Sequence, residues 1–198
     1  MALNEYLFPS SIVERDALKW KAGTGFSMRD RVIRDEIHRD VLVPAHHARI
    51  IDTNEFQRLR NIQQLSTCEF VFPSATHTRF AHSLGAYFLA GELTSSLQEV
   101  QPGLLSDSDA ELVQIGALLH DIGHPPYSHL LETPEVFATF HSHEHWGRIL
   151  LESNDSEIGK VLADVLGEER KQRLFALLDG QNECNGVPIA PFLKEIIS

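Results

Sequence analysis

Residues 108–129 carry the feature that most limits what this chain can fold into, because an apolar helix runs there directly into a group of histidines. The segment reads SDAELVQIGALLHDIGHPPYSH, and its apolar residues recur at helical intervals at Leu112, Ile115, Leu119 and Ile122. Ser108 and Glu111 have the spacing of a capping box, and Gly123 with the prolines after it marks the end of the helix. We therefore expect a buried helix whose last turn presents imidazoles.

Further helical patterns lie on both sides of this segment. One helix is expected to begin at Asp52, with Glu55 in capping-box spacing, and the next covers residues 77–100. Shorter helices are predicted at about 143–152, 156–166 and 168–178. Strand patterns are confined to residues 40–43 and 68–72, each bounded by proline. The sequence thus predicts a mostly α fold with minor short β-strands near the N-terminal third.

The composition of the chain limits the kinds of partner that it is expected to bind. Asp and Glu number 28 against 17 Lys and Arg, and the formal charge of −11 argues against broad binding to nucleic acid. Cys68 and Cys184 are too few for a disulfide framework and lack the CxxC spacing of a metal or redox pair. No apolar run reaches the roughly 20 residues of a membrane span, and the N-terminus lacks the pattern of a signal peptide. We expect a cytoplasmic protein that does not enter the membrane.

The neighbours His120 and Asp121 combine an imidazole and a carboxylate at the end of one helix, which suits a divalent metal ion. Adjacent helical residues do not share a face, so both can bind one ion only where the helix frays, as Gly123 favours. A third ligand must come from another element, and His82 in the preceding helix is the candidate. The alternative is a capped helix end with a satisfied histidine, which needs no metal.

A set of linked motifs carries a resemblance to a known family. The run RIIDTNEFQRLRNIQQL…FVFPSATHTRFAHSLGAYFLAGEL…LVQIGALLHDIGHPPYSHLLE…HEHWG lies between about Val32 and Gly147. It is similar to the deoxynucleoside triphosphate (dNTP) triphosphohydrolases of the HD-domain superfamily. The resemblance implies an HD-domain helical core, with the domain at residues 31–198 after an N-terminal extension at residues 1–30.

The resemblance assigns metal binding to three residues, His82, His120 and Asp121. The cofactor it implies is a divalent ion, for which Mg, Mn, Fe and Zn are all compatible. The resemblance also implies three substrate-binding residues. Arg79 is expected to contact phosphate, which its planar guanidinium suits. Gln64 is expected to contact the deoxyribose 3′ hydroxyl, and its neighbour Leu65 also to contact the substrate. The structural alternative for Arg79 is a surface salt bridge, and the alternative for Gln64 is an exposed helical amide.

Four further residues receive catalytic roles from the resemblance: His124, His129, Glu132 and His143. His124 and His129 are expected over the phosphates, with Glu132 orienting His129 as an acid–base pair. His143 is the middle histidine of HSHEHWG, and Ser142 before it is a candidate helix cap. The alternative for His124 and His129 is a polar loop fixed by the two prolines between them.

A regulatory site is implied as well. Positions that bind an activating guanine nucleotide at a subunit interface in vertebrate-type members correspond to Arg31, Asp52, Gln57 and Arg60. The alternative is structural, with Asp52 as a helix N-cap and Arg60 as an exposed helix residue. The nearby segment VIRDEIHRDVLV departs from the family's Asp-Pro-Ile-His-Gly. Glu36 and Arg39 replace proline and glycine, which argues against a tight turn there.

The activity that the resemblance implies is hydrolysis of a dNTP at its α-phosphate, giving a deoxynucleoside and triphosphate, with water activated by the metal. The implied partners are the dNTP substrate, an activating nucleotide and further copies of the chain in a homo-oligomer. Another HD chemistry remains open, either a nucleoside monophosphate phosphatase or a cyclic-nucleotide phosphodiesterase. Such an enzyme shares the metal ligands but has no use for Gln64 and Arg79 at these positions.

A third reading is a catalytically weak module that senses nucleotides. Family enzymes complete the metal site with an aspartate a little beyond a segment resembling PFLKEIIS, and this sequence stops at Ser198. We therefore expect a truncated chain with weakened turnover. Its last helix is expected to leave an apolar face without packing partners at Phe192, Leu193, Ile196 and Ile197.

Overall fold

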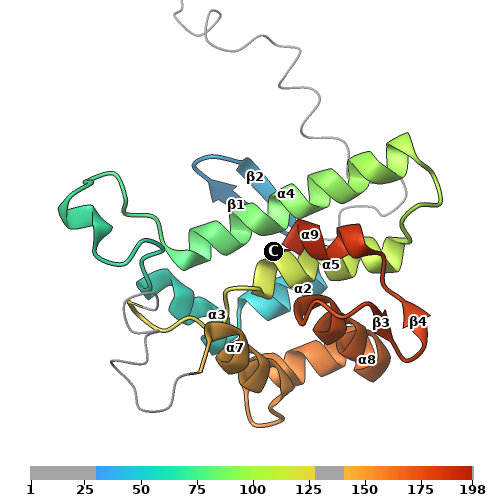
Figure 1. Cartoon of the computed structure of the whole chain (residues 1–198). Coiled ribbons are helices and arrows are strands. Elements are labelled where there is room, and N and C mark those ends of the chain that lie inside the picture. The colour runs from blue at the N-terminus through green and yellow to red at the C-terminus, as the bar shows by residue number, and fades with distance from the viewer. Residues whose placement is uncertain (1–29, 128–140, 198) are drawn as a thin grey trace, which may run out of the picture.

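The computed structural model describes residues 30–127 and 141–197, and it is built mainly of helices (Figure 1). In chain order its elements are β1 (Arg31–Asp35), β2 (Arg39–Val43), α2 (Ala45–Ile51), α3 (Asn54–Gln57), the 3₁₀ helices η1 (Arg58–Asn61) and η2 (Cys68–Phe70), α4 (Arg79–Val100), α5 (Asp107–Leu119), α7 (His143–Glu152), α8 (Glu157–Leu178), β3 (Glu183–Cys184), β4 (Val187–Pro188) and α9 (Pro191–Ile197). The predicted mostly α class with short N-terminal strands is confirmed. The second small hairpin, β3–β4, was not predicted.

Helix α5 is the centre of the core. Its residues from Leu112 to Leu119 are all buried, because α4, α8 and α9 pack around it (Figure 1). Two glycines let neighbouring elements approach closely. A Cβ on Gly91 of α4 would lie 2.4 Å from the Gln114 side-chain nitrogen, and one on Gly116 would lie 2.7 Å from Ile197 of α9. The helix that carries His120 is therefore held on several sides before it reaches the site.

Hydroxyl caps fix the starts of α4, α5, α7 and α8. The Thr78 side chain accepts a hydrogen bond from the backbone of Ala81 at the start of α4, and Ser142 caps α7 as predicted. The predicted cap of α5 is wrong, since Ser106 rather than Ser108 accepts from Asp109 N. The helix begins two residues earlier than expected, because Ser106 has the extended backbone of an N-cap and Ser108 is already helical.

Two further local predictions are wrong. Asp52 does not start a helix; it is the C-cap of α2, and the segment after it divides into α3 and η1. Residues 68–72 do not form a strand, because Cys68–Phe70 adopt a 3₁₀ helix and pair with no strand in the described part of the chain. Apolar alternation alone cannot supply the partner strand that a β-ladder needs.

The N-terminal hairpin forms the tight turn that the sequence argued against. Strands β1 and β2 pair antiparallel from Arg31 opposite Val43 to Asp35 opposite Arg39. The Asp35 carboxylate accepts hydrogen bonds from the backbone of Ile37 and His38, which closes the turn. Arg39, where the family has glycine, takes a φ of 61°. The hydrogen bonds to the Asp35 carboxylate therefore stabilise the turn without the proline and glycine of the family motif.

The C-terminal helices pack onto α5. The predicted helices at 156–166 and 168–178 are one element, α8, divided by non-helical Gly167 with a φ of 71°. The predicted loss of packing on the last helix is wrong for Leu193 and Ile197, which are 2% and 9% exposed against the core. Across residues 30–127 and 141–197, the helices include none both long and apolar enough to cross a membrane.

Replacing Gly123 by alanine should destabilise the fold, because a Cβ there would lie 2.0 Å from the backbone oxygen of His143 and 2.2 Å from the nitrogen of Gly147. Backbone atoms cannot move aside as a side chain can. We expect the free energy of unfolding to fall by about 1–3 kcal/mol or more, measured by urea denaturation.

The matched control is Gly147→Ala on the other side of the same contact. A Cβ there has no neighbour nearer than 3.4 Å, and alanine gains up to about 1 kcal/mol of helix propensity. This variant should be neutral or more stable. Equal losses in the two variants would contradict the packing described here.

Candidate metal centre

The end of α5 places two neighbouring residues on one site. Regular helix stops at Leu119, and His120 is its C-cap. The backbone then turns, with Ile122 N donating to Leu119 O and His124 N donating to Asp121 O. His120 and Asp121 can therefore point the same way, which a continuing helix would prevent.

His82 from α4 completes the group. Its Nε2 lies 3.2 Å from His120 Nε2 and 3.6 Å from Asp121 Oδ2, and His120 Nε2 lies 3.4 Å from Asp121 Oδ1. An ion with bonds of about 2.1 Å holds neighbouring ligand atoms roughly 3.0–3.4 Å apart. The three donors thus have the spacing and the chemistry of a divalent metal site. The convergence predicted from the sequence is present.

One hydrogen bond orients the His120 ring toward the site. Its Nδ1–H donates to the backbone oxygen of Ala117 at 2.8 Å, so Nε2 is the nitrogen that faces His82 and Asp121. Burial lowers the pKa of His82 and outweighs the nearby Asp121 carboxylate, which acts in the opposite direction. The hydrogen bond fixes the orientation of the His120 ring, and the lowered pKa favours the neutral, metal-binding form of His82.

A buried arginine fixes the carboxylate. Arg79 Nη1 donates to Asp121 Oδ2 at 2.7 Å, and the two side chains are 1% and 8% exposed. The Gln64 amide approaches the same oxygen at 3.4 Å. Burial alone would raise the pKa of Asp121, but the hydrogen bond from His124 and the positive charges around it keep that pKa well below its usual range. Asp121 is therefore ionised, and Arg79 holds it rather than facing solvent.

Two further histidines join the site from its other side. His124 Nε2 lies 3.3 Å from Asp121 Oδ1, and its ring stacks on His143 of α7 with centroids 3.7 Å apart. Asp121, His124 and His143 form a second group able to hold an ion, sharing the same carboxylate. The structure thus brings His124 and His143 beside the metal ligands. His129 and Glu132, the predicted acid–base pair, lie outside the described residues.

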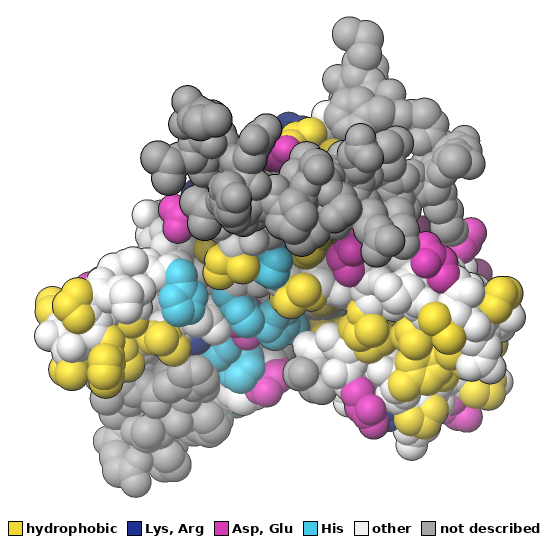
Figure 2. Space-filling view, turned by 90° about the horizontal axis from the view of Figure 1, so that it is seen from above, with side chains coloured by type: hydrophobic (Ala, Val, Ile, Leu, Met, Phe, Trp, Pro, Cys, Tyr) yellow, Lys and Arg dark blue, Asp and Glu magenta, His cyan; other side chains and the backbone are white. Residues whose placement is uncertain are grey.

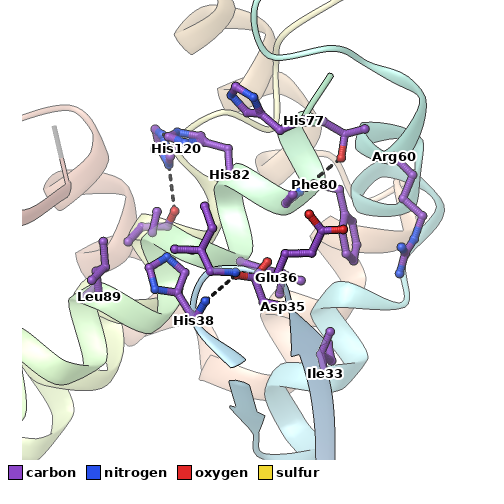
Figure 3. A pocket seen from close by; sticks show the side chains of 18 of the residues that line it. Ile33, Asp35, Glu36, His38, Arg60, His77, Phe80, His82, Leu89 and His120 are labelled. Atoms are coloured by element: carbon purple, nitrogen blue, oxygen red, sulfur yellow. Dashed lines mark hydrogen bonds between the residues drawn. The ribbon is translucent and has the colours of Figure 1, made fainter. Parts of the chain in front are cut away.

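A pocket of about 1140 Å³ opens next to these ligands. His82 and His120 stand in its wall, the hairpin turn with His38 lies opposite, and Leu89 of α4 adds an apolar surface (Figure 3). Figure 2 shows histidine side chains gathered in the middle of one face of the molecule. Leu65, predicted to contact substrate, is 45% exposed and lies outside this pocket lining.

The four residues predicted to bind a regulatory nucleotide are joined in two pairs. Arg31 Nη1 and Asp52 Oδ1 are 2.5 Å apart, with each side chain about half exposed. Arg60 Nε donates to Gln57 Oε1 at 2.7 Å, and its guanidinium lies 3.6 Å from the centre of the Phe80 ring. The structure therefore shows partners for each side chain and leaves the nucleotide role as a prediction.

Sequence reasoning missed two features near the site. Arg58 donates to the backbone oxygens of His124 and Ile122, which anchors the turn after Asp121. No local sequence pattern distinguishes Arg58 from the arginines around it, because its backbone partner at His124 is 66 residues away. A second cluster, His46 and His47 of α2 with Glu111 of α5, was also missed. Its one visible signal was the adjacent pair of histidines.

Comparison with known proteins agrees with this geometry. A model of the HD domain family matches residues 79–181, more than half of the 198 residues, so the chain belongs to the HD domain family. The matched region contains α4 and α5, and with them all three candidate ligands. HD domains bind divalent metals, as the donor set here allows.

The chain is similar to larger proteins over its HD region. The uncharacterized protein MJ1154 of Methanocaldococcus jannaschii is 47% identical over 118 residues, which are 60% of this chain and 23% of that protein. The deoxynucleoside triphosphate triphosphohydrolase SAMHD1 of Homo sapiens is 50% identical over 103 residues, 52% of this chain and 16% of that enzyme. The SAMHD1 homolog of Dictyostelium discoideum is 39% identical over 122 residues, 60% and 24% of the two chains. The chain spans less than a quarter of each relative.

Removing one member of the Arg79–Asp121 pair should be strongly destabilising. Arg79→Met leaves a buried carboxylate and Asp121→Asn leaves a buried guanidinium, so each should cost about 3–5 kcal/mol of unfolding free energy. The double variant should lose less than the sum, by at least about 1 kcal/mol, in a denaturation double-mutant cycle. Strict additivity would show that the two side chains do not depend on each other.

Proposed function

We propose that this chain is a metal-dependent phosphohydrolase that converts a dNTP to a deoxynucleoside and triphosphate. The observation that carries the proposal is the convergence of His82, His120 and Asp121 on one site at the edge of a large pocket. The similarity to dNTP triphosphohydrolases over the HD region supports the choice of substrate.

The bound ion would supply two kinds of chemistry, a lowered pKa for a water molecule and polarisation of a phosphate oxygen. The chain itself holds and orients the ligands. Arg79 keeps Asp121 ionised and in place, and adds a buried positive charge behind the site where phosphate charge develops. In the balanced reaction, water adds to the α-phosphorus while the bond from that phosphorus to the 5′ oxygen breaks, and the leaving oxygen takes up a proton.

The remaining side chains fit roles around the phosphates. We assign His124 and His143, stacked beside Asp121, to contacts with the triphosphate, as the family resemblance implies. Burial lowers the pKa of His124, although its hydrogen bond to Asp121 opposes this. We assign protonation of the 5′ oxygen to His129 with Glu132, as the family resemblance implies. The Gln64 amide lies beside the Asp121 carboxylate, and we assign it to the sugar of the substrate.

The regulatory prediction belongs to the same proposal. Binding of an activating nucleotide by Arg31, Asp52, Gln57 and Arg60 would exchange their present mutual contacts for contacts to base and phosphate. Because each pair is exposed, that exchange costs little. We also propose assembly into a homo-oligomer, in line with the family resemblance.

The identity of the products tests the proposed reaction. We expect the chain, incubated with a mixture of the four dNTPs and either Mg²⁺ or Mn²⁺, to release deoxynucleoside and inorganic triphosphate in equal amounts, as measured by mass spectrometry. His82→Ala/His120→Ala should lower the rate on the order of 10²-fold or more, because it removes both imidazole ligands.

His145→Ala is the matched control, since it removes an exposed imidazole of α7 outside the three candidate groups. It should keep the wild-type rate. Release of pyrophosphate or single phosphates, or unchanged turnover in the double variant, would contradict the proposal and favour another HD chemistry or a sensing module.

A further inference from the structure

A second group of metal-binding side chains lies toward the other end of α5. Glu111 stands nine residues before His120, roughly 13 Å along the helix. Its Oε1 lies 2.8 Å from His46 Nε2 and 3.1 Å from His47 Nε2, both from α2. The two imidazole rings have centroids 4.3 Å apart. Two histidines and a glutamate thus meet around one carboxylate oxygen.

The two oxygens of Glu111 have separate partners. Oε1 faces the imidazoles, while Oε2 accepts from Arg170 Nη2 of α8 at 2.5 Å. These hydrogen bonds, with those of His46 and His47 first, keep the pKa of Glu111 far below its usual range. The carboxylate is therefore ionised and fixed in orientation, with one oxygen available to a cation.

The buried histidine of the group is oriented from behind. His47 is 1% exposed, and its Nδ1 lies 2.8 Å from the hydroxyl of Tyr87 in α4. Burial raises the pKa of Tyr87, so the hydroxyl stays protonated, and burial lowers the pKa of His47, so its ring is neutral. A ligating imidazole needs this kind of partner on its second nitrogen.

We propose that His46, His47 and Glu111 form a second metal site, separate from the HD centre, and that it takes Zn²⁺. Two imidazoles and one carboxylate are an established zinc donor set, and the half-exposed His46 leaves a fourth position to water. For zinc–ligand bonds of about 2.1 Å, the distances from Glu111 Oε1 to the two imidazole nitrogens must increase by roughly half an ångström. The exposed His46 ring can make that movement.

The metal-free form of the group is a hydrogen-bond network in which each Nε2–H donates to Glu111. Zinc binding through Nε2 moves the proton of each neutral ring from Nε2 to Nδ1, and on His47 that Nδ1–H then donates to the Tyr87 hydroxyl oxygen. Arg170 still donates to the other oxygen of Glu111. The ion then ties α2 to α5, which leads into the HD centre. This inference does not depend on the proposed hydrolysis.

Zinc binding is tested in a background without the HD imidazoles, His82→Ala/His120→Ala. We expect equilibrium dialysis against micromolar Zn²⁺ to show one fewer bound ion per chain after adding His46→Ala. His145→Ala is again the matched control and should leave the count unchanged. Because His46 is half exposed, circular dichroism should show the same fold in all variants.

Tyr87→Phe provides a second readout, since it removes only the hydroxyl behind His47. It should weaken zinc binding at this site about 10- to 100-fold while the ion still binds at high concentration. An equal zinc count with and without His46 would overturn the proposal. An unchanged zinc affinity in Tyr87→Phe would overturn the assigned arrangement around His47.

Discussion

The buried ion pair between Arg79 and Asp121 is the interaction on which the rest of the site depends. It joins the first residue of α4 to the turn after α5, two segments that are 42 residues apart. His82 lies three residues after Arg79 and His120 directly precedes Asp121. Once the pair forms, the helical spacing on α4 and the end of α5 bring both imidazoles to the same carboxylate. Because each charge is buried, the fold cannot lose one partner without a large cost.

The turn after Asp121 is shaped by contacts that a local pattern does not contain. Gly123 touches the backbone of α7, and this close approach sets His143 against His124. Arg58 holds the backbone oxygens of the same turn from the side of η1. Two segments distant in sequence, α7 and η1, therefore fix one short stretch of chain, which explains how a helix end can serve as a rigid site.

Sequence reasoning succeeded where the signal was periodic or carried by linked motifs. It predicted α4, α7 and the core of α5, because helix periodicity is a local property. The grouping of His82 with His120 and Asp121 was predicted from their donor chemistry and from the family resemblance. It failed at Asp52 and at the cap of α5, where several residues could satisfy the same capping rule.

The remaining features depend on tertiary contacts. The turn at Arg39 forms because Asp35 closes it, although the residue types there argue against a turn. The second cluster needed α2, which the sequence did not reveal as a helix, and Glu111 was interpreted as part of a cap. In each case the partner that decides the outcome is not visible in the local sequence pattern.

The most direct test of the central claim is anomalous diffraction from crystals of the chain grown with Mn²⁺. We expect an anomalous peak within about 2.5 Å of His82 Nε2, His120 Nε2 and a carboxylate oxygen of Asp121. A structure with Mn²⁺ present in excess but no peak between these three side chains would contradict it.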